Sequence, residues 1–156
     1  LNVLPGQFLL DQVVEISLQG HAKHQKSALR AGDITIVRTG RPGDAAVVTP
    51  DLADTNCIDL IVARPGASIC AEYAVAFLNS QFGRRIFSSG TTGTAQQHFN
   101  VGEFSKLKLP VPPLAVQHEF VSRLTALRAP ILALEKRLRD ARITTAKVLS
   151  TSMFGA

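Results

Sequence analysis

The stretch AGDITIVRTGRPG, at residues 31–43, decides the fold of the first part of the chain. Residues 31–33 are typical of a turn, and residues 34–39 are a run of β-branched and apolar side chains that favours a strand. Residues 40–43 then stop the strand with two glycines and a proline. The stretch therefore predicts a strand bounded by tight turns on both sides.

Further short strands are expected around this one, as in a β meander. Apolar and polar residues alternate over 14–18, the period of two that is typical of a half-buried strand. Residues 45–49 and 57–63 repeat the β-branched pattern, with turn-forming residues between them. An apolar strand is also expected over 107–111, where a pair of prolines ends it.

The apolar period becomes helical after Ser68, a candidate N-cap, and Gly83 is expected to weaken the helix. Residues 91–100 are polar and have no sustained period, so they predict a loop. Asn100 and Glu103 have the form of a capping box, which predicts a short helix through Phe104. The residues that share one face of the first helix are Cys70, Tyr73, Ala74, Phe77, Leu78 and Phe82.

After Pro113 an unbroken heptad pattern predicts one long helix. A helix of roughly 37 residues is about 55 Å long, and a domain of this size cannot cover an apolar stripe of that length, so a partner helix is expected. Pro130 predicts a kink, because the heptad phase continues through it. The residues of this stripe, which we call the heptad seam, are Phe120, Leu124, Leu127, Ile131, Leu134, Leu138, Ala141, Thr145, Val148 and Ser152.

Composition indicates one globular domain with an appendage, because 46% of the 156 residues are hydrophobic. No run approaches the roughly 18 apolar residues of a transmembrane helix, and the beginning of the sequence lacks the pattern of a signal peptide. A cytoplasmic protein with no membrane partner is therefore expected. Cys57 and Cys70 are too few for a disulfide framework or a zinc site, and both are expected to be buried thiols.

The sequence contains no defined catalytic motif. Cys70 or Ser89 could be imagined with His98 as a nucleophile and its base, but there is no nucleophile elbow, no carboxylate pair and no metal-binding spacing. The glycines at 40–43 and 90–93 match neither a P-loop nor a dinucleotide fingerprint, although such turns let a backbone approach a DNA phosphate. No enzyme activity, metal or cofactor is therefore expected.

Basic residues are unevenly distributed along the chain. Up to Pro113 there are ten basic and nine acidic residues, a net +1, and after it seven and three, a net +4. Two windows contain basic residues and no acid, one between Glu15 and Asp33 and one between Glu72 and Glu103. Cations suit phosphates and amide or hydroxyl side chains suit base edges, and the lack of Trp favours a duplex over a single strand. The candidate DNA-binding residues are Lys23, Gln25, Lys26, Arg38, Arg41, Arg84, Arg85, Thr92, Gln96 and Gln97; the alternative is an ordinary solvated surface.

Four segments follow one another along the chain: GDITIVRTG at 32–40, FLNS at 77–80 with Gly83-Arg84, GTAQ at 93–96 with Phe99-Asn100, and LPVPPL at 109–114 with Gln117. In this order they resemble the DNA specificity subunit of type I restriction-modification systems, and the resemblance spans residues 29–150. It implies a target recognition domain followed by one spacer helix, a unit that the family normally carries twice, with its two helices antiparallel. It also implies a subunit without chemistry of its own, which serves a modification methyltransferase subunit and a restriction subunit. S-adenosylmethionine and ATP would belong to those partners.

The sequence departs from the family pattern in three ways. It has one unit, its beginning is short of the usual first strands, and Val116 stands where an acid commonly precedes Gln117. A half-length subunit that dimerises would restore two readers. A piece of a longer protein is the competing explanation.

The expected fold is α+β: a small, mixed or antiparallel, β-rich target recognition domain with one packed helix over 1–113, and a long coiled-coil helix over 114–156. Two such chains would hold their readers of double-stranded DNA a fixed distance apart on a bipartite target. The alternative is an assembly protein whose helix binds partner helices without reading DNA, and an enzyme in the β region would need a pocket with perturbed titratable groups. Dimerisation is assigned to Phe120, Leu124, Leu127, Ile131, Leu134 and Leu138.

Overall fold

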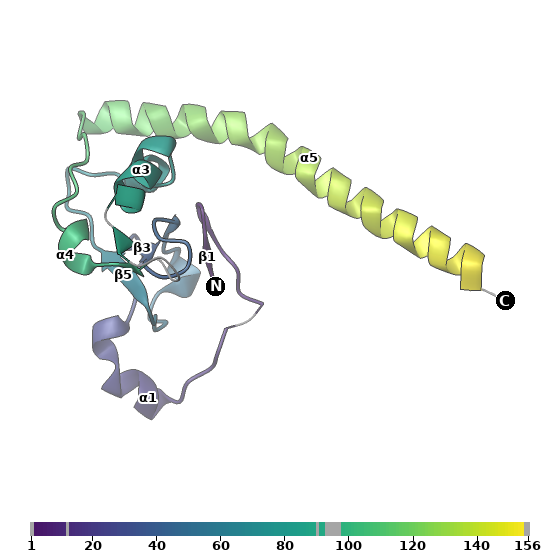
Figure 1. Cartoon of the computed structure of the whole chain (residues 1–156), viewed down its shortest axis with the longest axis horizontal. Helices are drawn as coiled ribbons and strands as arrows, with labels where there is room; N and C mark the ends of the chain where they lie inside the picture. The colour runs from purple at the N-terminus through teal and green to yellow at the C-terminus, as the bar shows by residue number, and fades with distance from the viewer. Residues whose placement is uncertain (1, 12, 90, 93–97, 155–156) are drawn as a thin grey trace. The chain divides into compact units, whose positions relative to one another are not determined.

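A computed structural model describes residues 2–11, 13–89, 91–92 and 98–154 of the chain. The chain divides into two compact units, Leu1–His118 and Glu119–Ala156. The first unit contains small antiparallel sheets and short helices, and the second consists of most of one long helix, α5 (Leu114–Phe154) (Figure 1). The expected α+β class is confirmed.

A three-stranded antiparallel sheet in the order β4-β3-β5 forms the centre of the first unit. The predicted central strand is β3 (Ile34–Val37), and it pairs with β4 (Ala45–Val47) and β5 (Leu60–Ala63). All four residues of β3 are buried. Its β-branched side chains pack well on a pleated surface, so the local preference and the tertiary structure agree.

The two faces of this sheet lie in separate hydrophobic clusters, because successive side chains of a strand point to opposite sides. Val37 joins the smaller cluster with Val3 and Ala46, beside the hairpin of β1 (Val3–Leu4) and β2 (Gln7–Phe8). The other face belongs to the larger cluster, whose buried members are Ile34, Ile36, Ala45, Ile61, Ala74, Val75, Leu78, Phe87 and Phe99.

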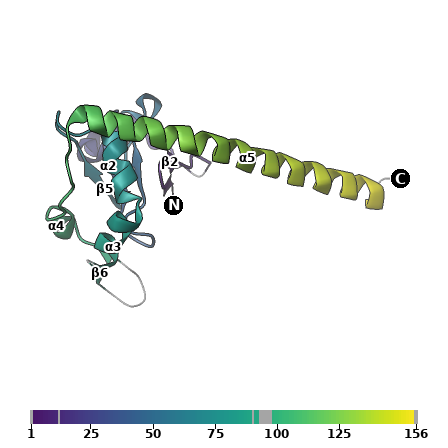
Figure 2. The ribbon, with the colours of Figure 1, turned by 90° about the horizontal axis from the view of Figure 1, so that it is seen from above.

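Two helices stand where one was predicted from Ser68 to Phe82. They are α2 (Ala71–Leu78), which lies against the sheet, and α3 (Gln81–Ser89) (Figure 2). The break coincides with Asn79, whose side chain accepts from the Ala45 N–H at 3.0 Å and donates to the Ala45 carbonyl oxygen at 2.8 Å. Gly83, which was expected to weaken the helix, lies inside α3, where a Cβ would overlap the Leu78 carbonyl oxygen.

The strand predicted over 14–18 is wrong. Ser17 instead caps α1 (Leu18–Lys23), accepting from the Gly20 N–H at 3.1 Å. Val14 and Leu18 are 87% and 88% exposed. The apolar and polar residues of 14–18 therefore alternate without a neighbouring strand to pair with. The N-cap interaction of Ser17 decides the local structure instead.

The strand predicted over 107–111 is also absent from the described structure. Leu107 and Leu109 pack against the larger cluster, and the Tyr73 hydroxyl donates to the Pro110 carbonyl oxygen at 3.1 Å. Proline has no N–H to offer a neighbouring strand. The segment is therefore held by its side chains and by this hydrogen bond.

The ends of the predicted loop 91–100 form a small hairpin, since β6 (Thr91–Thr92) pairs with β7 (His98–Phe99). Phe99 is buried, with its ring centroid 4.6 Å from that of Phe87. The predicted short helix is confirmed as α4 (Val101–Phe104), and the Asn100 side chain accepts from the Gly102 N–H at 3.0 Å. Only half of the capping box forms, because Glu103 bonds to Lys106 instead. Two 3₁₀ turns, η1 (Gln25–Ser27) and η2 (Pro50–Leu52), complete the unit.

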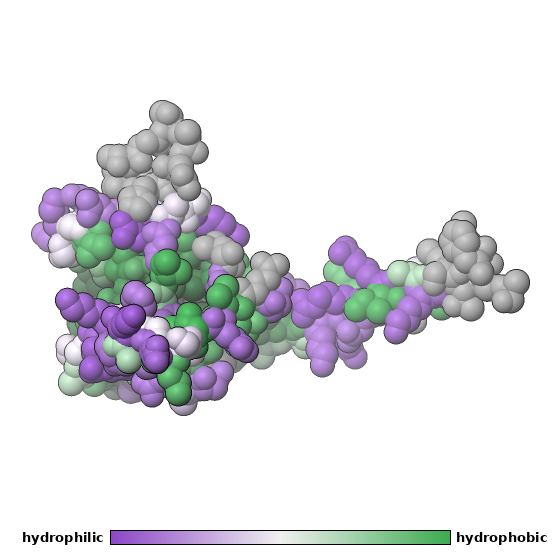
Figure 3. Space-filling model, turned by 90° about the horizontal axis from the view of Figure 1, so that it is seen from below, coloured by the Kyte–Doolittle hydropathy of each residue, from purple (hydrophilic) through white to green (hydrophobic). Residues whose placement is uncertain are grey.

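The long helix α5 runs unbroken through Pro130, and its ribbon bends gently along its length (Figure 1). Apolar side chains reach the surface among charged ones (Figure 3). Leu127 and Leu134 are 69% and 61% exposed, Leu124 is partly buried, and Phe120, Ile131 and Leu138 are also exposed. Within the described ranges, none of the helices combines the length and apolar character that crossing a bilayer requires.

Gly43 and Gly40 offer a matched test of packing at the β3–β4 turn. Both have positive φ, +97° and +82°, but a Cβ at Gly43 would lie 2.5 Å from the Phe87 ring, whereas nothing lies within 4 Å at Gly40. We expect Gly40→Ala to cost about 1–2 kcal/mol of unfolding free energy for the left-handed backbone. Gly43→Ala should cost about 1–3 kcal/mol more for overpacking. Urea unfolding measures both, and equal losses would contradict the packing of Phe87 on this turn.

Candidate nucleic-acid interface

Two buried aspartates stand at the two ends of the β3–β4 hairpin. Asp33 precedes β3 and is 1% exposed, and Asp44 precedes β4 and is 0% exposed. The Val48 N–H donates to the Asp33 carbonyl oxygen and the Val37 N–H to that of Asp44, each at 2.8 Å. Burying a carboxylate is costly unless cations and N–H groups pair with it. Each end of the hairpin therefore needs a cationic side chain or N–H donors beside its carboxylate.

Asp33 is paired with Arg64, which follows β5. Arg64 donates through Nε to Oδ1 and through Nη2 to Oδ2, both at 2.7 Å, and the Arg30 backbone N–H donates to Oδ2 at 2.9 Å. The Arg64 hydrogen bonds lower the pKa of Asp33 below its ordinary value, although burial opposes them. The same pairing raises the pKa of Arg64.

Asp44 brings together two of the candidate DNA-binding residues. Arg84 of α3 donates through Nη2 to Oδ1 at 3.0 Å, and Arg41 Nε lies 3.1 Å from Oδ2 as an ion pair. A third candidate, Arg38, has its Nε 3.6 Å from Asp59 Oδ1. These three arginines thus have carboxylate neighbours within the fold, and their predicted contacts with DNA remain predictions.

Lys23, Gln25 and Lys26 lie together on the segment formed by α1 and η1, and all three are exposed. Neither element contributes a buried residue. The segment is therefore not anchored by the hydrophobic core, and polar contacts must fix its position.

Asn56 supplies many of those polar contacts. Its Oδ1 lies 2.6 Å from His21 Nδ1, and its Nδ2 donates to the His24 carbonyl oxygen and to Ser27 Oγ, each at 2.9 Å. The Cys57 N–H also donates to the Ser27 carbonyl oxygen at 3.0 Å. One amide side chain thus connects both α1 and η1 to the loop before β5.

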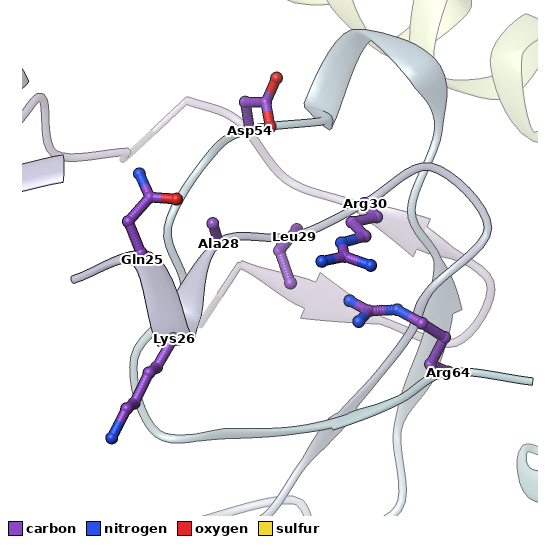
Figure 4. Close-up of a pocket in the computed structure, with 7 residues that line it drawn as sticks. All are labelled: Gln25, Lys26, Ala28, Leu29, Arg30, Asp54 and Arg64. Atoms are coloured by element: carbon purple, nitrogen blue, oxygen red, sulfur yellow. The ribbon is translucent and has the colours of Figure 1, made fainter. Parts of the chain in front are cut away.

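A pocket of about 320 Å³ adjoins this segment (Figure 4). Arg30 lies in an acid-free basic window of the sequence, where its guanidinium group suits a phosphate, whereas Arg64 was not among the candidate residues. Arg64 could have been found from the strand register: Ile34 lies opposite Ala63, so Asp33 and Arg64 are the next facing pair. Side chains that line the pocket include Gln25, Lys26, Leu29, Arg30, Asp54 and Arg64.

The remaining candidates lie elsewhere in the first unit. Arg85 is exposed on α3, and Thr92 belongs to β6. Gln96 and Gln97 lie outside the described residues. The structure therefore groups three of the ten candidates on one exposed segment and leaves the roles of the others as predictions.

Gln117 is a structural residue that the sequence analysis recorded only as part of a motif. It is 0% exposed. Its Oε1 accepts from the Cys70 N–H at 2.8 Å, and its Nε2 donates to the carbonyl oxygens of Ser68 and Pro112 at 2.9 and 2.7 Å. The first turn of α5 is thereby held within the first unit.

Residues 6–144 match the family model for the type I restriction modification DNA specificity domain. This chain belongs to that family. It is 24% identical over 147 residues to the type I restriction enzyme EcoBI specificity subunit of Escherichia coli, covering 90% of this chain and 30% of that protein. The fold resembles that of the HsdS subunit from Thermoanaerobacter tengcongensis, with a TM-score of 0.60 at 24% identity over 80% of this chain and 33% of that one. The chain thus spans about a third of the length of these relatives.

The cysteines of this specificity domain do not resemble activated nucleophiles. Both are partly buried, and burial raises the pKa of each thiol. Cys70 Sγ lies 3.1 Å from Glu72 Oε2, so a negative charge adjoins the thiol, whereas a reactive thiolate needs a positive environment. Among the described residues, no group of three or more His, Cys, Asp or Glu side chains is placed to hold a metal ion.

Asp33→Asn tests the first of the buried pairs. The pKa of Asp33 is lowered in the folded state from its ordinary 3.8, so the ionised carboxylate stabilises the fold above about pH 4, and this stability is lost as the pH falls through the lower folded-state value. We expect Asp33→Asn to cost about 1.5–3 kcal/mol at pH 7 and to reduce the acid-induced loss of stability.

Urea unfolding between pH 2.5 and 7 measures both effects. Asp51→Asn, at an exposed aspartate in η2, is the matched control and should preserve the acid-induced loss. The role of this pair would be contradicted by an Asp33→Asn variant that is as stable as the parent at pH 7 and loses as much unfolding free energy at acid pH.

Proposed function

We propose that this chain recognises double-stranded DNA in a sequence-specific way and directs a modification methyltransferase subunit, and with it a restriction subunit, to the target. The observation that carries the proposal is the exposed α1–η1 segment. It presents Lys23, Gln25 and Lys26 without using any of them in the core, on a domain of the DNA specificity family.

The residues of this segment have different chemical roles in the proposal. Lys23 and Lys26 are compact charges suited to phosphates, which set affinity and register, whereas the Gln25 amide can pair with a base edge. Arg85 on α3 and Thr92 in β6 extend the same proposal. Gln96 and Gln97, which lie outside the described residues, are proposed with them. Arg38, Arg41 and Arg84 serve the fold first, because each has a carboxylate neighbour.

We also propose that the heptad seam packs antiparallel against the same helix of a second copy. Large apolar side chains stay exposed along α5, and burying each would contribute roughly 1.5–3 kcal/mol. Farther along, Thr144 and Thr145 hydroxyls donate to the carbonyl oxygens four residues earlier, at 2.9 Å each. Two readers held by such a pair would contact half-sites at a fixed separation.

The proposed role needs no chemistry in this chain. S-adenosylmethionine, ATP and the reacting groups would belong to the partner subunits. The second candidate function, assembly through α5 without DNA reading, is favoured by the same exposed seam. Selection from a random duplex library separates the two, because a reader enriches one sequence and an assembly protein enriches none, with or without the methyltransferase.

Lys26→Ala tests the phosphate contacts. If Lys26 neutralises one phosphate, the variant should bind all duplex sequences more weakly and flatten the plot of log affinity against log salt by roughly 0.9. Gln25→Ala should instead keep the slope and change the enriched base at one position. Fluorescence anisotropy at several salt concentrations measures the slope. An unchanged slope for Lys26→Ala would remove it from the interface.

Leu127→Asp with Leu134→Asp tests the seam. We expect the parent chain to be a dimer and the double variant a monomer, because two charges would be buried against apolar neighbours. Leu132→Asp is the matched control: Leu132 is 58% exposed on α5 but lies off the seam, so the dimer should persist. Light scattering measures the mass, and a parent chain that is already monomeric would contradict the homodimer.

A further inference from the structure

The pocket beside the start of β3 brings two groups of like charge together. Arg30 and Arg64 both line it, and their guanidinium groups point toward each other in Figure 4. Asp54 and Gln25 occupy the other end of the same view. The carboxylate of Asp54 on the pocket wall therefore lies apart from the two guanidinium groups in this view.

Arg64 is held in place by Asp33, whereas the Arg30 side chain forms no ion pair with a described carboxylate. Two of the five N–H donors of Arg64 bind Asp33, so three remain for another ligand. The Arg30 backbone N–H also binds Asp33, but within the described part of the chain no carboxylate forms an ion pair with the Arg30 side chain. One buried carboxylate thus faces two guanidinium groups.

Converging cations repel each other, and an anion between them removes the repulsion. Guanidinium groups match phosphate oxygens with paired hydrogen bonds. Lys26 and Gln25, on the proposed DNA-binding segment, line the same pocket. A DNA backbone that runs along this segment could therefore place one of its phosphates beside the two arginines.

We propose that this pocket seats one phosphate group of the DNA backbone, bound by the guanidinium groups of Arg30 and Arg64. The inference rests on the proposed DNA recognition for the source of the phosphate. Asp33 acts as a positioning residue, because it fixes the orientation of Arg64 before DNA arrives. Arg30 binds the phosphate directly.

Arg30→Gln is the decisive variant, because Arg30 is exposed and its side chain takes no part in the core. It should weaken duplex binding and flatten the salt slope by roughly 0.9, whereas Arg30→Lys, which keeps the charge, should keep the slope. Lys108→Gln removes the same charge at an exposed lysine outside the pocket and should leave the slope at the parent value. Thermal unfolding checks that all three variants are folded.

A titration with inorganic phosphate tests the pocket independently of DNA. Titration at constant ionic strength, against chloride, should shift the Nε–Hε NMR resonances of Arg30 and Arg64 in the parent chain. Shifts without duplex binding by the parent would overturn the proposed function and support the pocket as a seat for free phosphate. Duplex binding with an unchanged slope in Arg30→Gln would overturn the assignment to DNA, and no shift together with that unchanged slope would overturn the site itself.

Discussion

A buried carboxylate must be paired, and Asp33 and Asp44 impose this requirement at both ends of the hairpin on which the first unit is built. At one end, the register of β5 against β3 places Arg64 beside Asp33. At the other, Asp44 binds Arg84 and so connects α3 to the hairpin, next to the turn that Phe87 covers. The pairs thereby link secondary structure that is distant in the sequence.

The same requirement separates the basic residues by role. The arginines that neutralise Asp33 and Asp44 stabilise the fold. If one of them left its aspartate to bind DNA, the buried carboxylate would be unpaired, at a large cost in free energy. The side chains of Lys23, Lys26 and Arg30 form no ion pair with a carboxylate among the described residues. They lie on or beside a segment that has no core residue of its own. We infer that a rigid hairpin provides the platform, and that the α1–η1 segment, positioned by Asn56, provides the contact surface.

Sequence reasoning succeeded where local preferences decide the structure. The β-branched run of β3, its flanking turns and the heptads of α5 are strong local signals, and each produced the expected element. It failed over 14–18, where alternation had no partner strand, and at Asn79, where hydrogen bonds to Ala45 across the fold accompany the break between α2 and α3. At the candidate site, a basic residue is recognisable from composition, but its partner is not. Only the strand register shows that Arg64 is anchored on Asp33.

The most direct measurement compares Arg84→Gln with Lys23→Gln in unfolding free energy and in the salt dependence of duplex binding. The account predicts opposite results. Arg84→Gln should lose about 1.5–3 kcal/mol of stability and keep the parental salt slope, whereas Lys23→Gln should change stability by no more than about 0.5 kcal/mol and flatten the slope by roughly 0.9. An Arg84→Gln variant with unaltered stability and a flattened slope would contradict it.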